Sequence, residues 1–263
     1  MKLSNKIYAK LKFKTCFTKF RINKKINTSV NFSSQTDVEY FMVLDEYYDE
    51  SYINYSHECK PGLNIFTNCD CPHHGFYFKE AIHIFADFGY GNYLHQVYLP
   101  TNMPKIICED NVIQTKKLFL GEAYLLNDIN TIKILVQKGA AKYPDNVREA
   151  TMQIIRYGDT NMLEYFLSLD ANKHVNYGIY FLQACAYNQL DVVKYLISKQ
   201  MVDIKSTIIF KDNNFNYGSC QASTQFLTRS IIEITDHRTI DVCALLLATN
   251  YGYVDLVKYL SSR

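Results

Sequence analysis

A pattern that recurs at a fixed period in the second half of the chain constrains its fold more than any other feature. Four segments combine a polar turn, an acidic or amide residue and a run of apolar residues: 126–135, 157–167, 187–196 and 251–260. The acidic or amide position falls at Asn130, Asn161, Asp191 and Asp255, in steps of 31, 30 and 64 residues. A period of about 20–50 residues is typical of arrays whose units bury their apolar faces only by stacking.

Five units of two short helices are predicted from this spacing, at about 115–142, 143–172, 173–204, a degenerate 205–238, and 239–263. In the third unit apolar residues recur at helical spacing on both expected helices: Phe181, Leu182, Cys185, Ala186, Val192, Val193, Leu196 and Ile197. We expect these residues in the core, because the same positions stay apolar in every clear unit. Over 205–238 the pattern is lost, and 212–219 has the composition of an inserted loop.

Residues 35–114 differ from the repeating part and predict a small α+β module. The runs 75–78 and 94–99 alternate apolar and polar residues and indicate strands. Between them, 81–89 is typical of a short helix that Gly89 ends. The run 112–120 is consistent with a last strand.

The first 34 residues form a basic arm. Residues 1–30 contain nine Lys or Arg and no Asp or Glu, so the other 233 residues hold 19 basic and 26 acidic groups, a net charge of −7. Such an arm suits nucleic acid or an anionic membrane surface. An organelle transit segment and a poorly ordered terminus are the other interpretations. The long apolar core of a secretory signal is missing, and no run of 18 apolar residues predicts a membrane span.

The eight cysteines are read as reduced thiols of an intracellular protein, since no secretory signal precedes them. A cluster of thiols and imidazoles contains His57, Cys59, Cys69, Cys71, His73 and His74, and Cys59, Cys69, Cys71 and His73 are its candidate zinc ligands. One residue separates Cys69 from Cys71, whereas zinc knuckles use about two to four. The alternative is a loop whose cysteines and histidines reflect composition or local packing.

No catalytic constellation is found in the sequence. The nucleophile elbow G-x-S-x-G, the phosphate loop G-x-x-x-x-G-K, the dinucleotide motif G-x-G-x-x-G and H-E-x-x-H are all absent. We therefore predict that the chain is not an enzyme and needs no cofactor.

The repeating blocks, of the form A-x-x-x-G-x-x-D-hydrophobic-V-K-Y-L, and the closing tripeptide Lys138-Gly139-Ala140 resemble those of ankyrin-repeat proteins over 115–263. They are similar to the ankyrin-repeat family of giant DNA viruses of amoebae, and the runs 61–65, 75–78, 85–89 and 97–100 are similar to the module that precedes the repeats there. The family's Thr-Pro-Leu-His tetrapeptide is absent from every unit. The resemblance implies an α+β module followed by an ankyrin-repeat α-solenoid. It further implies a viral protein of the host cytoplasm that scaffolds protein–protein interaction. Some viral ankyrin proteins are adaptors for host degradation, but no terminal adaptor motif is present.

Tyrosines stand just before the inter-helix turn in the three clear units. Tyr157, Tyr187 and Tyr251, together with Gln153 and Gln183, are the predicted partner-binding residues. Large amphipathic side chains of this kind are typical of interface hot spots. The alternative is that the tyrosines pack between neighbouring units. We expect a monomer with an unidentified protein partner.

Overall fold

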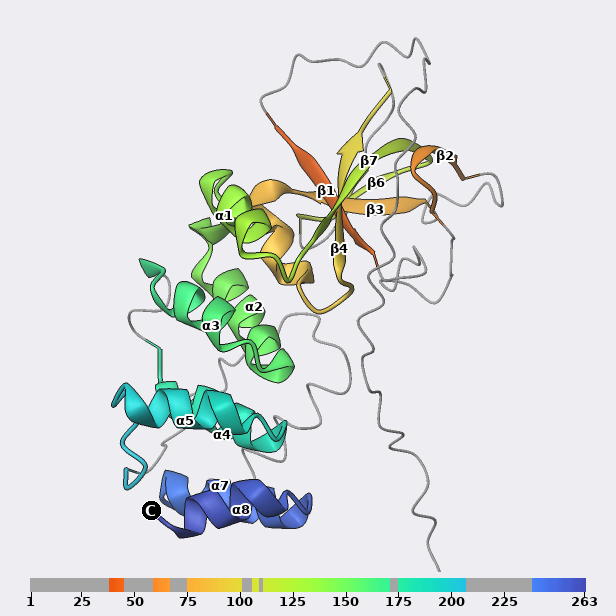
Figure 1. Ribbon diagram of the computed structural model, residues 1–263. Helices are drawn as coiled ribbons and strands as arrows, with labels where there is room; N and C mark the ends of the chain where they lie inside the picture. The colour runs from red at the N-terminus through yellow and green to blue at the C-terminus, as the bar shows by residue number, and fades with distance from the viewer. Residues whose placement is uncertain are drawn as a thin grey trace, which may run out of the picture. The chain divides into compact units, whose positions relative to one another are not determined.

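The computed structural model (Figure 1) describes residues 38–44, 59–66, 75–100, 106–108, 111–170, 175–206 and 238–263. All of them belong to one compact unit that spans residues 31–263.

An antiparallel sheet of seven strands occupies the N-terminal part of the described residues. Its strand order is β2-β7-β4-β1-β3-β6-β5. The strands are β1 (Tyr40–Leu44), β2 (Gly62–Ile65), β3 (Phe76–Glu80), β4 (Tyr93–Tyr98), β5 (Ile106–Ile107), β6 (Ile113–Thr115) and β7 (Lys117–Leu125). The strand β4 lies between β1 and β7, with a register shift between His95 and Val97.

Both faces of this sheet bury apolar side chains. Phe41 and Val43 of β1 lie in a large core that the helices share. Met42 and Leu44, which alternate with them and so face the other side, lie in a second core within the sheet region. Helices therefore cover one side of the sheet, and on the other side apolar residues from several of its strands form the second core.

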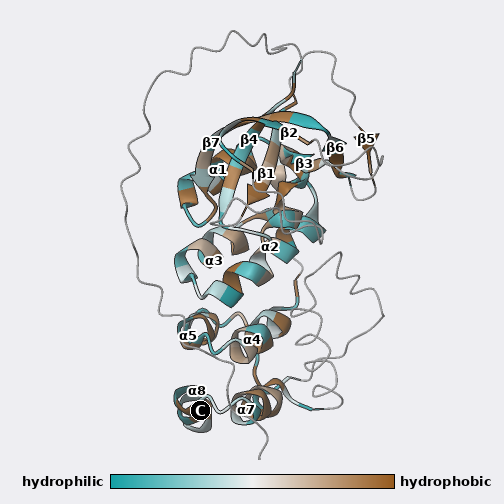
Figure 2. Cartoon of the chain, turned by 90° about the vertical axis from the view of Figure 1, so that its right-hand side faces the viewer, coloured by the Kyte–Doolittle hydropathy of each residue, from teal (hydrophilic) through white to brown (hydrophobic). Residues whose placement is uncertain are grey.

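Helices follow the sheet, and most of them come in consecutive pairs (Figures 1 and 2). The helical segments are η1 (Ala81–Asp87), α1 (Ile129–Gln137), η3 (Ala140–Lys142), α2 (Pro144–Tyr157), α3 (Thr160–Leu167), α4 (Tyr177–Ala186), α5 (Leu190–Ser198), α7 (Ile240–Asn250) and α8 (Val254–Ser261). The pairs are α2 with α3, α4 with α5, and α7 with α8, and α4 contacts both α2 and α7. The first helices of the pairs thus form one continuous row.

Side-chain caps decide where several of these helices begin. Asp159 accepts a hydrogen bond from the amide of Met162 at the start of α3, and Asn176 accepts one from Gly178 at the start of α4. Pro144 occupies the first turn of α2, where its missing N–H costs nothing. Each cap satisfies a backbone donor that the helix leaves open.

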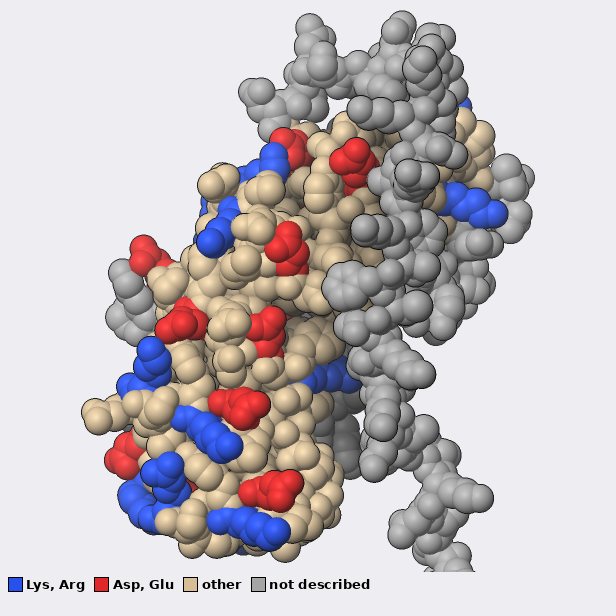
Figure 3. Space-filling view, viewed as in Figure 1, with Lys and Arg blue, Asp and Glu red and all other residues tan. Residues whose placement is uncertain are grey.

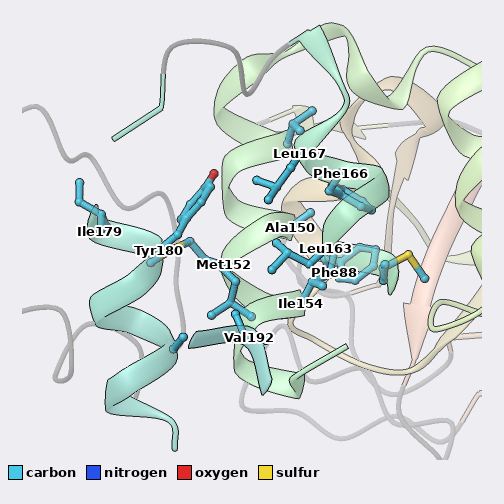
Figure 4. Close-up of a cluster of buried hydrophobic side chains, with 14 of the residues drawn as sticks. Phe88, Ala150, Met152, Ile154, Leu163, Phe166, Leu167, Ile179, Tyr180 and Val192 are labelled. Atoms are coloured by element: carbon cyan, nitrogen blue, oxygen red, sulfur yellow. The ribbon is translucent and has the colours of Figure 1, made fainter. Parts of the chain in front are cut away.

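The helical segment of the sheet region and the helix pairs share a hydrophobic core (Figure 4). The ring of Phe166 in α3 lies 5.2 Å from that of Phe85 and 5.9 Å from that of Phe88. Met152, Ile154 and Leu163 belong to the same cluster. The sheet region and the helices are therefore joined by packing rather than by a linker.

The two predicted strands of the N-terminal part and the short helix between them are confirmed. Strands β3 and β4 lie at the runs 75–78 and 94–99, which were predicted to be strands. The segment between them contains the helix η1, directly after β3. The run predicted as one strand over 112–120 is divided between β6 and the start of β7.

The predicted fold class, a small α+β module followed by an ankyrin-repeat α-solenoid, is wrong. The structure instead combines a seven-stranded antiparallel sheet with helices in one α+β arrangement. Residues Lys117–Leu125, where the first repeat was expected, form the strand β7, which pairs with β2 and β4. Helices are present farther along, but the described residues do not show an ankyrin solenoid. The expected loop at 212–219 lies outside the described residues.

Among the residues that the structure describes, no helix has both the length and the apolar character needed to cross a bilayer.

Candidate functional site

The three predicted tyrosines occupy equivalent positions at the ends of the first helices of the pairs. Tyr157 is the last residue of α2, and Tyr187 and Tyr251 are the C-caps of α4 and α7. The next residue in each turn has a left-handed backbone, with φ of 78° at Gly158, 58° at Asn188 and 72° at Gly252. We call these three turns, 157–159, 187–189 and 251–253, the helix-end surface.

Exposure separates the tyrosines. Tyr157 is 56% exposed and Tyr251 is 39% exposed. Tyr187 is half-buried, and the guanidinium of Arg156 lies 5.3 Å from the centre of its ring. Tyr157 and Tyr251 are therefore available to a partner, whereas Tyr187 takes part in the contact between the ends of α2 and α4.

Hydrogen bonds connect each of the later turns to the preceding pair. The side-chain nitrogen of Gln189 donates to the carbonyl oxygen of Arg156 at 2.5 Å. The hydroxyl of Tyr253 donates to the carbonyl oxygen of Ala186 at 3.2 Å. Gln189 and Tyr253 both stand two residues after their tyrosine, and each satisfies a carbonyl that a helix end leaves open. Equivalent side-chain bonds thus join the end of α2 to the turn after α4, and the end of α4 to the turn after α7.

A second contact orders the end of the surface near the C-terminus. The rings of Tyr251 and Tyr253 stack, with centroids 5.7 Å apart and an angle of 25° between the planes. Because Tyr253 is itself held by its bond to Ala186, the exposed ring of Tyr251 rests on a fixed neighbour. A tyrosine has only two side-chain torsions, so ordering it on binding costs little entropy.

The two glutamines predicted to bind a partner lie inside the molecule. Gln153 is 5% exposed and Gln183 is 1% exposed. The amide nitrogen of Gln153 donates to Glu149 at 3.3 Å, and the side chain also lies against Gly89. Their position places them in the contacts between elements and not on the helix-end surface.

Charged groups near the helices are interspersed rather than gathered by sign (Figure 3). Lys199 pairs with Glu164 at 3.2 Å, and Lys205 pairs with Asp241 at 2.5 Å. These exposed pairs link neighbouring helix pairs. Two of the three tyrosines of the helix-end surface are exposed, so we expect recognition there to depend on its aromatic groups.

The described cysteines in the helices serve as apolar residues. Cys185 in α4 and Cys243 in α7 are buried in the core. Burial raises the pKa of both thiols, so they stay protonated near neutral pH and do not act as nucleophiles.

Of the predicted zinc ligands, only Cys59 lies among the described residues. It is buried in the second core of the sheet region. Cys69, Cys71 and His73 lie outside the described residues, so the zinc site stays a prediction. Within the described ranges, no group of three or more His, Cys, Asp or Glu side chains is placed to hold a metal ion.

Compared with known proteins, the chain matches no family model, no curated protein and no solved structure.

Proposed function

We propose that the chain is a non-catalytic interaction protein that binds another protein at the helix-end surface. One observation supports this proposal most strongly: Tyr157 and Tyr251 are exposed although they lie at turns that hydrogen bonds and ring stacking hold in place. Aromatic side chains that are already ordered give contact area at a low entropic cost.

The spacing of the helices suggests the kind of partner. Helices in contact lie about 8–10 Å apart, so the two exposed tyrosines, separated by α4, are about 16–20 Å apart. An extended segment of about five or six residues spans that distance at about 3.3 Å per residue. We propose a partner segment of this length with apolar side chains near both ends and backbone groups that the tyrosine hydroxyls can bond.

The test compares three forms of the full chain in affinity capture from the native cells. We expect the Tyr157→Ala, Tyr251→Ala double variant to lose a partner that the unchanged chain retains, because truncating a hot-spot side chain costs about 2 kcal/mol or more. Tyr143→Ala is the matched control, since Tyr143 is 36% exposed but stands just before α2, where its ring stacks on His83. Retention of the same proteins by the double variant would contradict the proposal.

A further variant separates binding from folding. Tyr187→Ala removes a half-buried ring from beneath Arg156, so we expect it to lower the melting temperature more than it weakens partner binding. The double variant should show the opposite balance, since Tyr157 and Tyr251 are both more exposed than the half-buried Tyr187.

A second candidate function is based on the nine basic residues of the first 30, which lie outside the described residues. We propose that they bind nucleic acid or an anionic membrane. Such binding weakens steeply with salt, because each phosphate contact releases counterions. It should also disappear from a chain that begins at residue 31, whereas protein binding at the helix-end surface should survive that deletion.

A further inference from the structure

A cavity of about 300 Å³ lies between the sheet and α1. Its sheet side includes Phe41 of β1, Leu94 of β4 and Tyr124 of β7, and α1 contributes Ile134 and Leu135. A space of this size accommodates a small organic molecule, and the lining is mostly apolar with a few polar groups, as ligand sites commonly are.

An ion pair joins the two walls of this cavity. Lys138, which follows α1, and Glu39, which precedes β1, both line the cavity, and their charged atoms are 2.6 Å apart. Their side chains are 32% and 39% exposed. Pairs with this much exposure contribute only about 0–1 kcal/mol, so a ligand with a suitable charge can replace one member.

The charges around the cavity favour a cation. Glu39 contributes its carboxylate to the lining. Burial raises the pKa of Tyr98, a neighbour outside the lining, and Tyr124, Glu122 and Glu39 raise it further. The carbonyl end of α1 points to Lys138 and adds partial negative charge there. Among the described residues that line the cavity, Lys138 is the one cation and Glu39 the one carboxylate.

Other polar groups that line the cavity can accept hydrogen bonds from a ligand. The carboxylate of Glu39 has a second oxygen, and the hydroxyl of Thr131 can accept while it donates to Asp128 at 3.3 Å. Phe41 and Tyr124 add aromatic rings to the lining, a group whose π face attracts a cation.

We propose that this cavity binds a small organic cation, an amine carried on an aromatic or short aliphatic body. The body lies against Phe41, Leu94 and Leu135, and the ammonium group binds the carboxylate of Glu39 in competition with Lys138. This site is separate from the helix-end surface, so either proposal can fail without the other.

The first experiment uses two probes with the same ring and opposite charges, 2-phenylethylamine and 3-phenylpropionate. Their binding to the full chain is measured by saturation-transfer NMR titration near neutral pH. We expect the amine to bind and the carboxylate to bind at least several-fold more weakly. Equal or tighter binding of 3-phenylpropionate, or no binding of either probe, overturns the proposal.

Variants of the ion pair then give opposite effects on the amine. Glu39→Gln should weaken its binding about two- to fivefold, the range expected for a half-exposed ion pair. Lys138→Met should strengthen it by a similar factor, because the carboxylate loses its competing partner. An unchanged dissociation constant in Glu39→Gln overturns the proposal.

The chain offers matched controls for both variants. Lys199 is the C-cap of α5, as Lys138 is of α1, and it also pairs with a glutamate, Glu164. Lys199→Met and Glu164→Gln make the same changes of charge away from the cavity, so neither should alter amine binding. An equal change in these controls would assign the effect to net charge and overturn the proposal.

Discussion

Lys79 and Asp87 show how strongly single residues matter in the sheet region. The ammonium of Lys79 lies 2.6 Å from the carboxylate of Asp87, and their side chains are 3% and 10% exposed. Burial raises the pKa of Asp87, and the neighbouring Lys79 opposes that effect. The pair connects β3 with the end of η1 and so fixes the segment that packs against α2.

Removing one member of this pair should destabilise the chain far more than removing both. We expect Lys79→Met to lower the free energy of unfolding by about 3–5 kcal/mol, because Asp87 would stay buried without its cation. The Lys79→Met, Asp87→Leu double variant should recover most of that loss. Urea denaturation of the three proteins measures the difference, and a double variant as unstable as the single one would contradict the prediction.

The polar side chains of Gln153 and Gln183 do not reveal whether these residues are exposed or buried. Gln153 and Gln183 are predicted to bind a partner, which requires an exposed position. The structure buries both, because the neighbouring elements cover their sides of α2 and α4. Helical periodicity shows which residues share a face, but not how much of that face a distant segment covers.

At the scale of the elements, the three turns of the helix-end surface have the same backbone but different surroundings. A Cβ at position 252 would meet nothing within 4 Å, whereas one at position 158 would collide with the side chain of Gln189. Gln189 is the residue that bonds the carbonyl of Arg156. An alanine at position 252 would therefore add backbone strain alone. An alanine at position 158 would add that strain and also disrupt the bond between Gln189 and Arg156.

We expect Gly252→Ala to lower the free energy of unfolding by about 1–2 kcal/mol, the cost of a left-handed backbone in a residue with a Cβ. Gly158→Ala should cost about 1 kcal/mol more, since it also disrupts the bond of Gln189 to Arg156. Thermal denaturation compares them, with Asn188→Gly as a control that should cause little loss. Equal effects of the two alanine variants would show that this bond contributes nothing.

Element types were largely predictable from the sequence, and their assembly was not. The turns at Gly158 and Gly252 and the alternation over 94–99 are local signals, and the structure has turns and a strand there. The strand β7 also contains a local signal, because Leu118 and Leu120 alternate with more exposed residues and are buried. The regular period of the later units predicts a repeat over this segment. The pairing of β7 with β4 shows that the segment is instead a strand of the sheet.

At the scale of the whole molecule, the shared core predicts that the sheet region and the first helix pairs unfold together. Phe166 contacts Phe85 and Phe88 across this junction and is fully buried. Phe166→Ala should lower the free energy of unfolding by about 3–5 kcal/mol. Hydrogen exchange should then show faster exchange in η1 as well as in α2 and α3. A loss of protection confined to α3 would indicate that the two parts unfold separately.

No pattern in the sequence predicts the cavity beside α1. Glu39 and Lys138 are 99 residues apart, and no sequence pattern connects them. Their meeting depends on β1 lying beside β4 and on α1 covering that face, which are properties of the assembled fold. The tyrosines could be proposed from sequence because one turn recurs, whereas this site occurs once.

The bonds between successive pairs also imply an order of events during synthesis. The carbonyl of Arg156 must wait for Gln189, 33 residues later, and that of Ala186 must wait for Tyr253, 67 residues later. Until those residues leave the ribosome, these two carbonyls lack the side-chain donors that they bond in the folded protein. Among the described helix pairs, each of the first two is therefore joined to a pair synthesised after it, so the nascent chain gains its final order from the N-terminal side onward.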